Sequence, residues 1–180
     1  MEAIKLENYT YQDYLDIDKT TKENEMIELI FGEIYMMSGA SAKHQDAVGN
    51  LYFQIKQINK NDKCKPRIAP YDIKLKNKDD ISVVQPDVMI MCQDSEIPCA
   101  VFEVLSPSTA SKDKGIKKDL YELSGIKEYY IINIDLKIID KYILDNSKYY
   151  YIKGYSLSDT VSIDCVDVDI LVDKIFEDIG

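Results

Sequence analysis

Val83-Val84-Gln85-Pro86-Asp87-Val88-Met89-Ile90 and Ala100-Val101-Phe102-Glu103-Val104-Leu105 are two apolar runs that each carry an acidic residue. Both runs are rich in residues that favour β-strands. A buried carboxylate is costly unless it is paired, hydrogen-bonded or bound to a metal ion. Two carboxylates on consecutive strands also repel each other, and a divalent cation relieves that repulsion. The two runs therefore predict a metal site formed by Asp87 and Glu103.

The size and composition of the chain are typical of a globular protein. Its 180 residues are enough for one domain with a sizeable core, so we expect residues 1–180 to form a single domain. Apolar residues make up 46% of the chain, yet no apolar run is long enough to span a membrane. Residues 1–7 contain acids and no apolar signal region, which predicts a cytoplasmic location and no membrane partner.

The cysteines and the single histidine argue against a zinc site. Cys64, Cys92, Cys99 and Cys165 form no CxxC pair, and His44 is the only histidine. A structural zinc site needs four such ligands at close spacing. We therefore expect the cysteines to be reduced and mostly packed in the interior, as is usual in the cytoplasm.

The charge of the chain is uneven. The net charge of −10 argues against a general nucleic-acid-binding surface, because DNA affinity comes mainly from neutralised phosphates. Lysines nevertheless cluster at residues 56–67 and 112–118, while acids crowd residues 159–178. A local basic patch remains compatible with this distribution.

The spacing of apolar residues predicts the order of the elements. We expect helices over residues 11–17, 44–60 and 111–124, and strands over residues 26–30, 33–37, 68–75, 81–91, 98–105, 128–134, 137–144, 149–153 and 160–166, before a docking tail at 171–176. Thr10 and Ser41 are the expected helix N-caps. This order predicts an α/β (α+β) domain with a mixed central β-sheet flanked by helices, an N-terminal hairpin and a C-terminal β extension.

Lys117 is a third candidate for the site. Asp113, Lys117 and Tyr121 share one face of the predicted helix at four-residue spacing, beside an apolar stripe. The Lys117 charge could reach a phosphate group near Glu103 or orient a water molecule. The alternative is an Asp113–Lys117 ion pair on the surface, which would contribute little to stability.

Several sequence blocks are similar to a known family. Pro86-Asp87 followed by Glu103 resembles the PD-(D/E)xK nuclease superfamily, and the closer resemblance is to the Uma-two (DUF820-type) family of restriction-endonuclease-like proteins. The blocks that carry the resemblance run in order along the chain and are Tyr9-Thr10-Tyr11-Gln12-Asp13-Tyr14-Leu15, Glu28-Leu29-Ile30-Phe31-Gly32-Glu33-Ile34, Gln85-Pro86-Asp87, Glu103-Val104-Leu105-Ser106-Pro107-Ser108-Thr109 and 113–121.

The resemblance implies a restriction-endonuclease-like core and a metal-dependent endonuclease that hydrolyses phosphodiester bonds, with DNA as the expected partner. Mg²⁺ would be the cofactor, with Mn²⁺ as a substitute, and Asp87 and Glu103 would be its ligands. The superfamily lysine normally lies two residues after the acid, where this chain has Leu105. The closer family places that lysine on the following helix, and Lys117 matches the position.

Three further residues could complete the site. His44 lies on the apolar face of its predicted helix, whereas Asp46 points away from that face. His44 could hydrogen-bond a metal-associated water or act as a base, and the alternative is a packed or capping side chain. Glu28 and Glu33 match acids that are common in the family. One of them could complete the metal site, and we rank Glu33 slightly above Glu28.

Two other functions compete with the nuclease. The chain could be a catalytically inactive nucleic-acid- or protein-binding module that keeps the nuclease fold. It could also be a structural homodimer subunit that associates through tyrosines of a β-hairpin, which are Tyr149, Tyr150, Tyr151 and Tyr155. Metal binding separates the enzyme from both alternatives, because neither needs two clustered acids.

Overall fold

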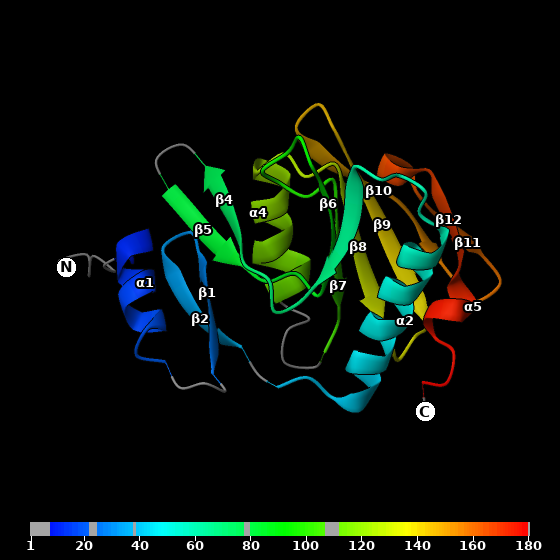
Figure 1. The fold of residues 1–180 in the computed structure, drawn as a ribbon, viewed down its shortest axis with the longest axis horizontal. Helices are drawn as coiled ribbons and strands as arrows, with labels where there is room; N and C mark the ends of the chain where they lie inside the picture. The colour runs from blue at the N-terminus through cyan, green and yellow to red at the C-terminus, as the bar shows by residue number, and fades with distance from the viewer. Residues whose placement is uncertain (1–7, 22–24, 38, 78–79, 107–111, 180) are drawn as a thin grey trace, which may run out of the picture.

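The computed structural model describes residues 8–21, 25–37, 39–77, 80–106 and 112–179. Its strands form two sheets and a separate hairpin (Figure 1). The four-stranded sheet has the order β2-β1-β5-β4, and its strands are β1 (Met26–Ile30), β2 (Glu33–Met37), β4 (Ile73–Asn77) and β5 (Asp80–Val84). The six-stranded sheet has the order β10-β9-β8-β7-β6-β3, and its strands are β3 (Cys64–Ile68), β6 (Val88–Cys92), β7 (Ala100–Val104), β8 (Glu128–Asn133), β9 (Ile138–Asp145) and β10 (Lys148–Tyr155).

Helices and sheets alternate as layers. Helix α1 (Tyr11–Asp18) covers the outer face of the four-stranded sheet, where Tyr14 packs in one apolar cluster with residues of β1 and β5. Helix α4 (Lys118–Leu123) lies between the two sheets, because its buried residues share a cluster with residues of both (Figure 1). Helices α2 (Ala42–Ile58) and α5 (Val172–Ile175) cover the far face of the six-stranded sheet.

The alternation of side chains along β7 places Glu103. Phe102 and Val104 pack in the cluster on the α2 side, whereas Val101 packs in the cluster on the α4 side. Successive side chains of a strand point to opposite faces, so Glu103 lies on the α4 side with Val101. Strand β7 is paired on both edges, antiparallel with β6 and parallel with β8. Glu103 is therefore held in the centre of the sheet.

The expected mixed sheet, N-terminal hairpin and C-terminal β extension are confirmed, but the single strand expected at residues 81–91 is wrong. The structure divides it into β5 and β6, which belong to different sheets. Pro86 has no N–H to donate, so pairing stops there and the chain crosses between the layers at residues 85–87. The strand expected at residues 68–75 is likewise divided between β3 and β4, with Pro70 in the connection.

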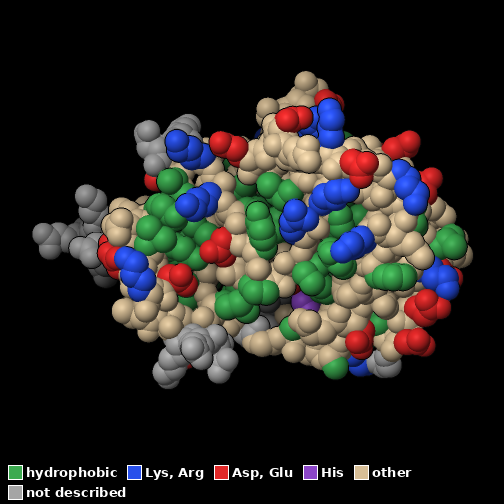
Figure 2. Space-filling model, viewed as in Figure 1, with side chains coloured by type: hydrophobic (Ala, Val, Ile, Leu, Met, Phe, Trp, Pro, Cys, Tyr) green, Lys and Arg blue, Asp and Glu red, His purple; other side chains and the backbone are tan. Residues whose placement is uncertain are grey.

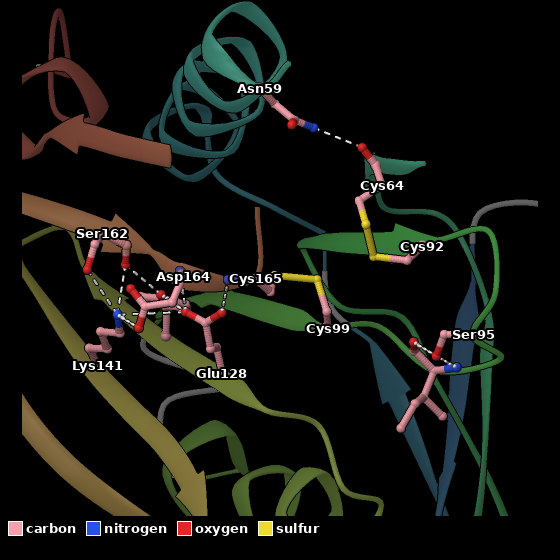
Figure 3. The surroundings of a disulfide bond; sticks show 12 residues. Asn59, Cys64, Cys92, Ser95, Cys99, Glu128, Lys141, Ser162, Asp164 and Cys165 are labelled. Atoms are coloured by element: carbon pink, nitrogen blue, oxygen red, sulfur yellow. Dashed lines mark hydrogen bonds and ion pairs between the residues drawn. A yellow bond between two sulfur atoms is a disulfide. The ribbon is translucent and has the colours of Figure 1, made fainter. Parts of the chain in front are cut away.

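The C-terminal extension is more elaborate than expected. Strands β11 (Thr160–Ile163) and β12 (Val168–Leu171) form a hairpin, and α5 follows directly, where only a docking tail was expected at residues 171–176. Lys141 is buried beneath it, and its Nζ lies 2.8 Å from Asp164 Oδ2 and 2.9 Å from the Ser162 carbonyl oxygen (Figure 3). This polar cluster fixes the extension to β9.

The expectation of reduced cysteines is wrong. The structure contains disulfides between Cys64 and Cys92 and between Cys99 and Cys165 (Figure 3). Cys64 and Cys92 are directly opposite each other on β3 and β6, and Cys99 precedes β7 beside the short turn at residues 164–166. Sequence spacing did not indicate either pair, because the partners are brought together only by strand pairing. Among the described helices, none combines the length and the apolar character that a bilayer crossing requires.

Candidate active site between the two sheets

A cavity of 280 Å³ lies where the chain passes between the layers. Each of three connections contributes to its wall, namely residues 39–40 before α2, residues 69–70 between β3 and β4, and residues 85–87 between β5 and β6. The charged and polar side chains that line it are His44, Gln45, Gln85, Asp87, Glu103, Ser106, Lys112, Asp113 and Lys117.

Asp87 and His44 form one side of the cavity. The Val104 N–H donates a hydrogen bond to Asp87 Oδ2 at 2.8 Å, which ties Asp87 to the end of β7. His44 Nε2 lies 3.2 Å from the same oxygen. His44 is in the first turn of α2 and only 9% exposed. Burial opposes its charge, but the hydrogen bond and the negative charge of Asp87 raise the pKa of His44 above its ordinary value.

Glu103 lies on β7, close to Asp87, which directly precedes the neighbouring strand β6. It is 2% exposed, and its Oε1 accepts hydrogen bonds from Lys117 Nζ at 3.0 Å and from Tyr121 Oη at 2.6 Å. Burial and the nearby carboxylates of Asp113 and Asp87 outweigh the charge of Lys117, so the pKa of Glu103 is raised above its ordinary value.

Lys117 is shared between several acids. Its Nζ lies 2.9 Å from Glu28 Oε1, 3.0 Å from Glu103 Oε1 and 4.0 Å from Asp113 Oδ1. Burial opposes its charge, but these carboxylates keep the pKa of Lys117 above its ordinary value. Asp113 and Lys117 are each 2% exposed, so the alternative of a surface ion pair is wrong. Both lie in a π-helical turn, residues 113–117, a local geometry that is frequent at functional sites.

Glu28, rather than Glu33, joins this cluster. Glu28 is fully buried on β1, and its Oε2 lies 2.6 Å from Lys112 Nζ. Burial opposes ionisation, but Lys117 and Lys112 lower the pKa of Glu28 below its ordinary value. Glu33 is exposed near the hairpin turn, accepts a hydrogen bond from Tyr35 Oη at 2.6 Å and does not line the cavity. The positions of the two residues therefore favour Glu28 over Glu33 as the additional acid of the site, contrary to the ranking made from the sequence.

The lowered pKa of Glu28 predicts how its contribution to stability depends on pH. Its ionised form stabilises the folded state above the pKa of the unfolded chain, and this contribution is lost as the pH falls through the lower folded pKa. We expect Glu28→Gln to reduce the free energy of unfolding at pH 7 by about 3 kcal/mol, and this loss should shrink below about pH 4. Urea unfolding at pH 7 and below about pH 4 measures the loss of stability at each pH. The control is Glu33→Gln, because Glu33 is exposed. An equal loss at both pH values would contradict the assignment.

The donor set of the cavity fits a hard divalent cation. Asp87 and Glu103 offer carboxylate oxygens, and the interactions described above use one oxygen of each. Mg²⁺ needs only one or two carboxylates because it keeps several waters. Among the described residues, no group of three or more His, Cys, Asp or Glu side chains is arranged to hold a metal ion. Carboxylate oxygens suit Mg²⁺ or Mn²⁺, whereas Zn²⁺ is usually held by several Cys or His side chains.

The structure brings together Asp87, Glu103, Lys117, His44 and Glu28, which were all candidates from the sequence. It also adds residues that the sequence did not single out for the site, namely Asp113, Lys112 and Gln85 in the cavity wall and Tyr121 on Glu103. The four-residue spacing of Asp113, Lys117 and Tyr121 was a signal for two of these. Lys112 belongs to the lysine cluster at residues 112–118 and Gln85 to the Gln85-Pro86-Asp87 block, but their place in the site depends on how the two sheets meet.

Comparison with known proteins places the chain in a family. The family model Uma2, described as "Putative restriction endonuclease", matches residues 11–170. The chain belongs to the Uma2 family. An uncharacterized protein of Synechocystis sp. is 27% identical to this Uma2 chain over 174 residues, which cover 92% of the chain and 90% of the relative.

A crystal structure supports the fold of this Uma2 member. It is described as "a putative nuclease belonging to DUF820" from Anabaena variabilis, and it superposes with a TM-score of 0.71 at 15% sequence identity. The match covers 95% of this chain and 99% of the other chain. The resemblance to the Uma-two family that the motif blocks indicated is confirmed, and so is the expected nuclease-like fold.

Proposed function

We propose that this Uma2 protein is a Mg²⁺-dependent endonuclease that hydrolyses phosphodiester bonds in DNA. The observation that carries the proposal is the meeting of the Asp87 and Glu103 carboxylates with a buried lysine in one cavity. Asp87 lines it from the connection directly before β6, Glu103 lines it from the paired strand β7, and Lys117 Nζ lies 3.0 Å from Glu103. Metal-dependent nucleases need such oxygen ligands beside a positive charge, because the transition state gains negative charge on phosphate oxygens.

The residues of the cavity have distinct roles in this proposal. Asp87 and Glu103 would hold Mg²⁺, which supplies a water of lowered pKa and offsets the charge of the phosphate. Lys117 keeps Glu103 in place and adds a positive charge that faces the cavity. His44 donates from Nε2 to Asp87, so we assign it the orientation of that carboxylate in place of the role of base. Glu28 holds Lys117 from the other sheet.

A basic surface beside the cavity supports DNA as the partner despite the net charge of −10. Lysine and arginine side chains gather across the middle of the face shown in Figure 2, while acidic side chains lie mainly toward its edges. Lys65 and Arg67 are exposed on β3, the edge strand that leads directly to the Ala69–Pro70 wall of the cavity. A DNA backbone that follows this strand would reach Asp87.

Cleavage of supercoiled plasmid tests the proposal. We expect nicking with Mg²⁺ or Mn²⁺ that stops when the metal is chelated. Asp87→Asn should lower Mn²⁺ affinity in calorimetry by about 10- to 100-fold. The matched control is Asp46→Asn on the exposed face of the same helix as His44. Absence of cleavage of plasmid, single-stranded DNA and RNA at all metal concentrations would favour the inactive binding module instead. A homodimer and a cytoplasmic location stay predictions.

A further inference from the structure

Gln85 has an oxygen that no described residue satisfies. The side chain is 8% exposed and lines the cavity, and its Oε1 is buried without a hydrogen-bond partner among the described residues. A buried polar atom without a partner is costly, so this oxygen, in a residue that lines the cavity, calls for a water, an ion or another donor opposite it. Gln85 directly precedes Pro86-Asp87 in the connection between β5 and β6.

The orientation of the Gln85 amide is fixed by its neighbours. Its Nε2 donates to Asp72 Oδ1 at 2.7 Å, and a carboxylate can only accept. The NH₂ group must therefore face Asp72, and the oxygen must face away from it. The backbone N–H of Gln85 donates to Glu28 Oε1 at 3.0 Å, which holds the residue from the other side. Oε1 is thus a fixed acceptor.

An acceptor of this kind restricts what can bind opposite it. A phosphate oxygen is excluded, because it would meet another acceptor. A cation or a donor group is required. The cavity wall already contains the carboxylates of Asp87, Glu103 and Asp113, which favour a cation. Amide oxygens are common ligands of hard divalent cations.

We propose that Gln85 Oε1 is a neutral oxygen ligand of the divalent cation that Asp87 and Glu103 hold, an inference that rests on the proposed function. Gln85 supplies a third protein oxygen without adding charge. Asp72 acts through Gln85 as a positioning residue, because it lies outside the cavity wall and fixes which end of the amide is left to accept.

Two substitutions at Gln85 separate metal ligation from a structural role. Neither methionine nor a glutamate carboxylate can donate to Asp72, and glutamate adds like-charge repulsion there, so a purely structural role predicts a defect in Gln85→Glu at least as large as in Gln85→Met. Only glutamate keeps an oxygen at the inner position. Mn²⁺ titration calorimetry of the wild type, Gln85→Met and Gln85→Glu provides the measurement, with circular dichroism to verify that each variant is folded.

We expect Gln85→Met to weaken Mn²⁺ binding by about tenfold and Gln85→Glu to bind at least as tightly as the wild type. Weakening in Gln85→Glu that equals or exceeds the weakening in Gln85→Met would overturn the inference and make Gln85 a structural partner of Asp72. Unchanged Mn²⁺ affinity in Gln85→Met, with reduced DNA cleavage, would overturn it in favour of a contact with a base or sugar donor. Absence of Mn²⁺ binding in the wild type would overturn both the inference and the proposed function.

Discussion

Glutamine in place of Glu103 is expected to reduce DNA cleavage by at least about 100-fold while leaving the protein folded. The amide can still accept the hydrogen bond from Tyr121 Oη, but it is a much poorer ligand for Mg²⁺ than a carboxylate. Because burial raises the pKa of Glu103, a neutral side chain suits this position. The free energy of unfolding without metal should change by no more than about 1 kcal/mol.

Plasmid cleavage rates and urea unfolding at pH 7 measure the two effects of Glu103→Gln. The matched control is Glu96→Gln, since Glu96 is exposed in the loop that precedes the same strand. Cleavage at the wild-type rate in Glu103→Gln would remove Glu103 from the metal site. Unfolding of the variant would show that Glu103 is required for the fold rather than for catalysis.

Unlike Glu103→Gln, methionine in place of Lys117 is expected to cause a large loss of stability as well as a loss of cleavage. Lys117 neutralises the buried Glu28 carboxylate and donates a hydrogen bond to Glu103, and it is itself only 2% exposed. Breaking a buried ion pair on one side leaves uncompensated charge and costs about 3–5 kcal/mol. The methionine fills a similar volume, so the loss reports on charge rather than on a cavity.

Chemical unfolding of Lys117→Met measures this loss, and Lys114→Met is the matched control. Lys114 lies in the same π-helical turn but is exposed, so its replacement should change the free energy of unfolding by no more than about 0.5 kcal/mol. Equal stability of the two variants would contradict the ion-paired cluster.

The central part of the site could be predicted from the sequence because it is encoded locally. Asp87 and Glu103 interrupt apolar runs that cannot tolerate an unpaired charge, and their separation suits neighbouring strands. The N-caps Thr10 and Ser41 are also local, and the structure confirms both, although the second helix begins at Ala42 rather than at residue 44. These features depend on a few adjacent residues.

The features that were not predicted depend on tertiary contacts. Residues 81–84 and 88–91 both have strand propensity, and Pro86 marks a break between them, but only the pairing partners assign the two halves to different sheets. Glu28 and Glu33 lie on the same hairpin, and the position of the π-helical turn over β1 decides which of them meets Lys117. The pairing of Cys99 with Cys165 likewise depends on where the C-terminal hairpin docks.

The chain crosses between the two layers three times beside the cavity, so the cavity lies near the axis about which one sheet could rotate against the other. If one sheet rotates against the other, atoms near residues 39–40, 69–70 and 85–87 move least, because the chain joins the layers there. The outer ends of α1 and β10 move most. A long polymer that binds the outer surfaces could therefore rotate one sheet against the other while the spacing of Asp87, Glu103 and Lys117 is preserved.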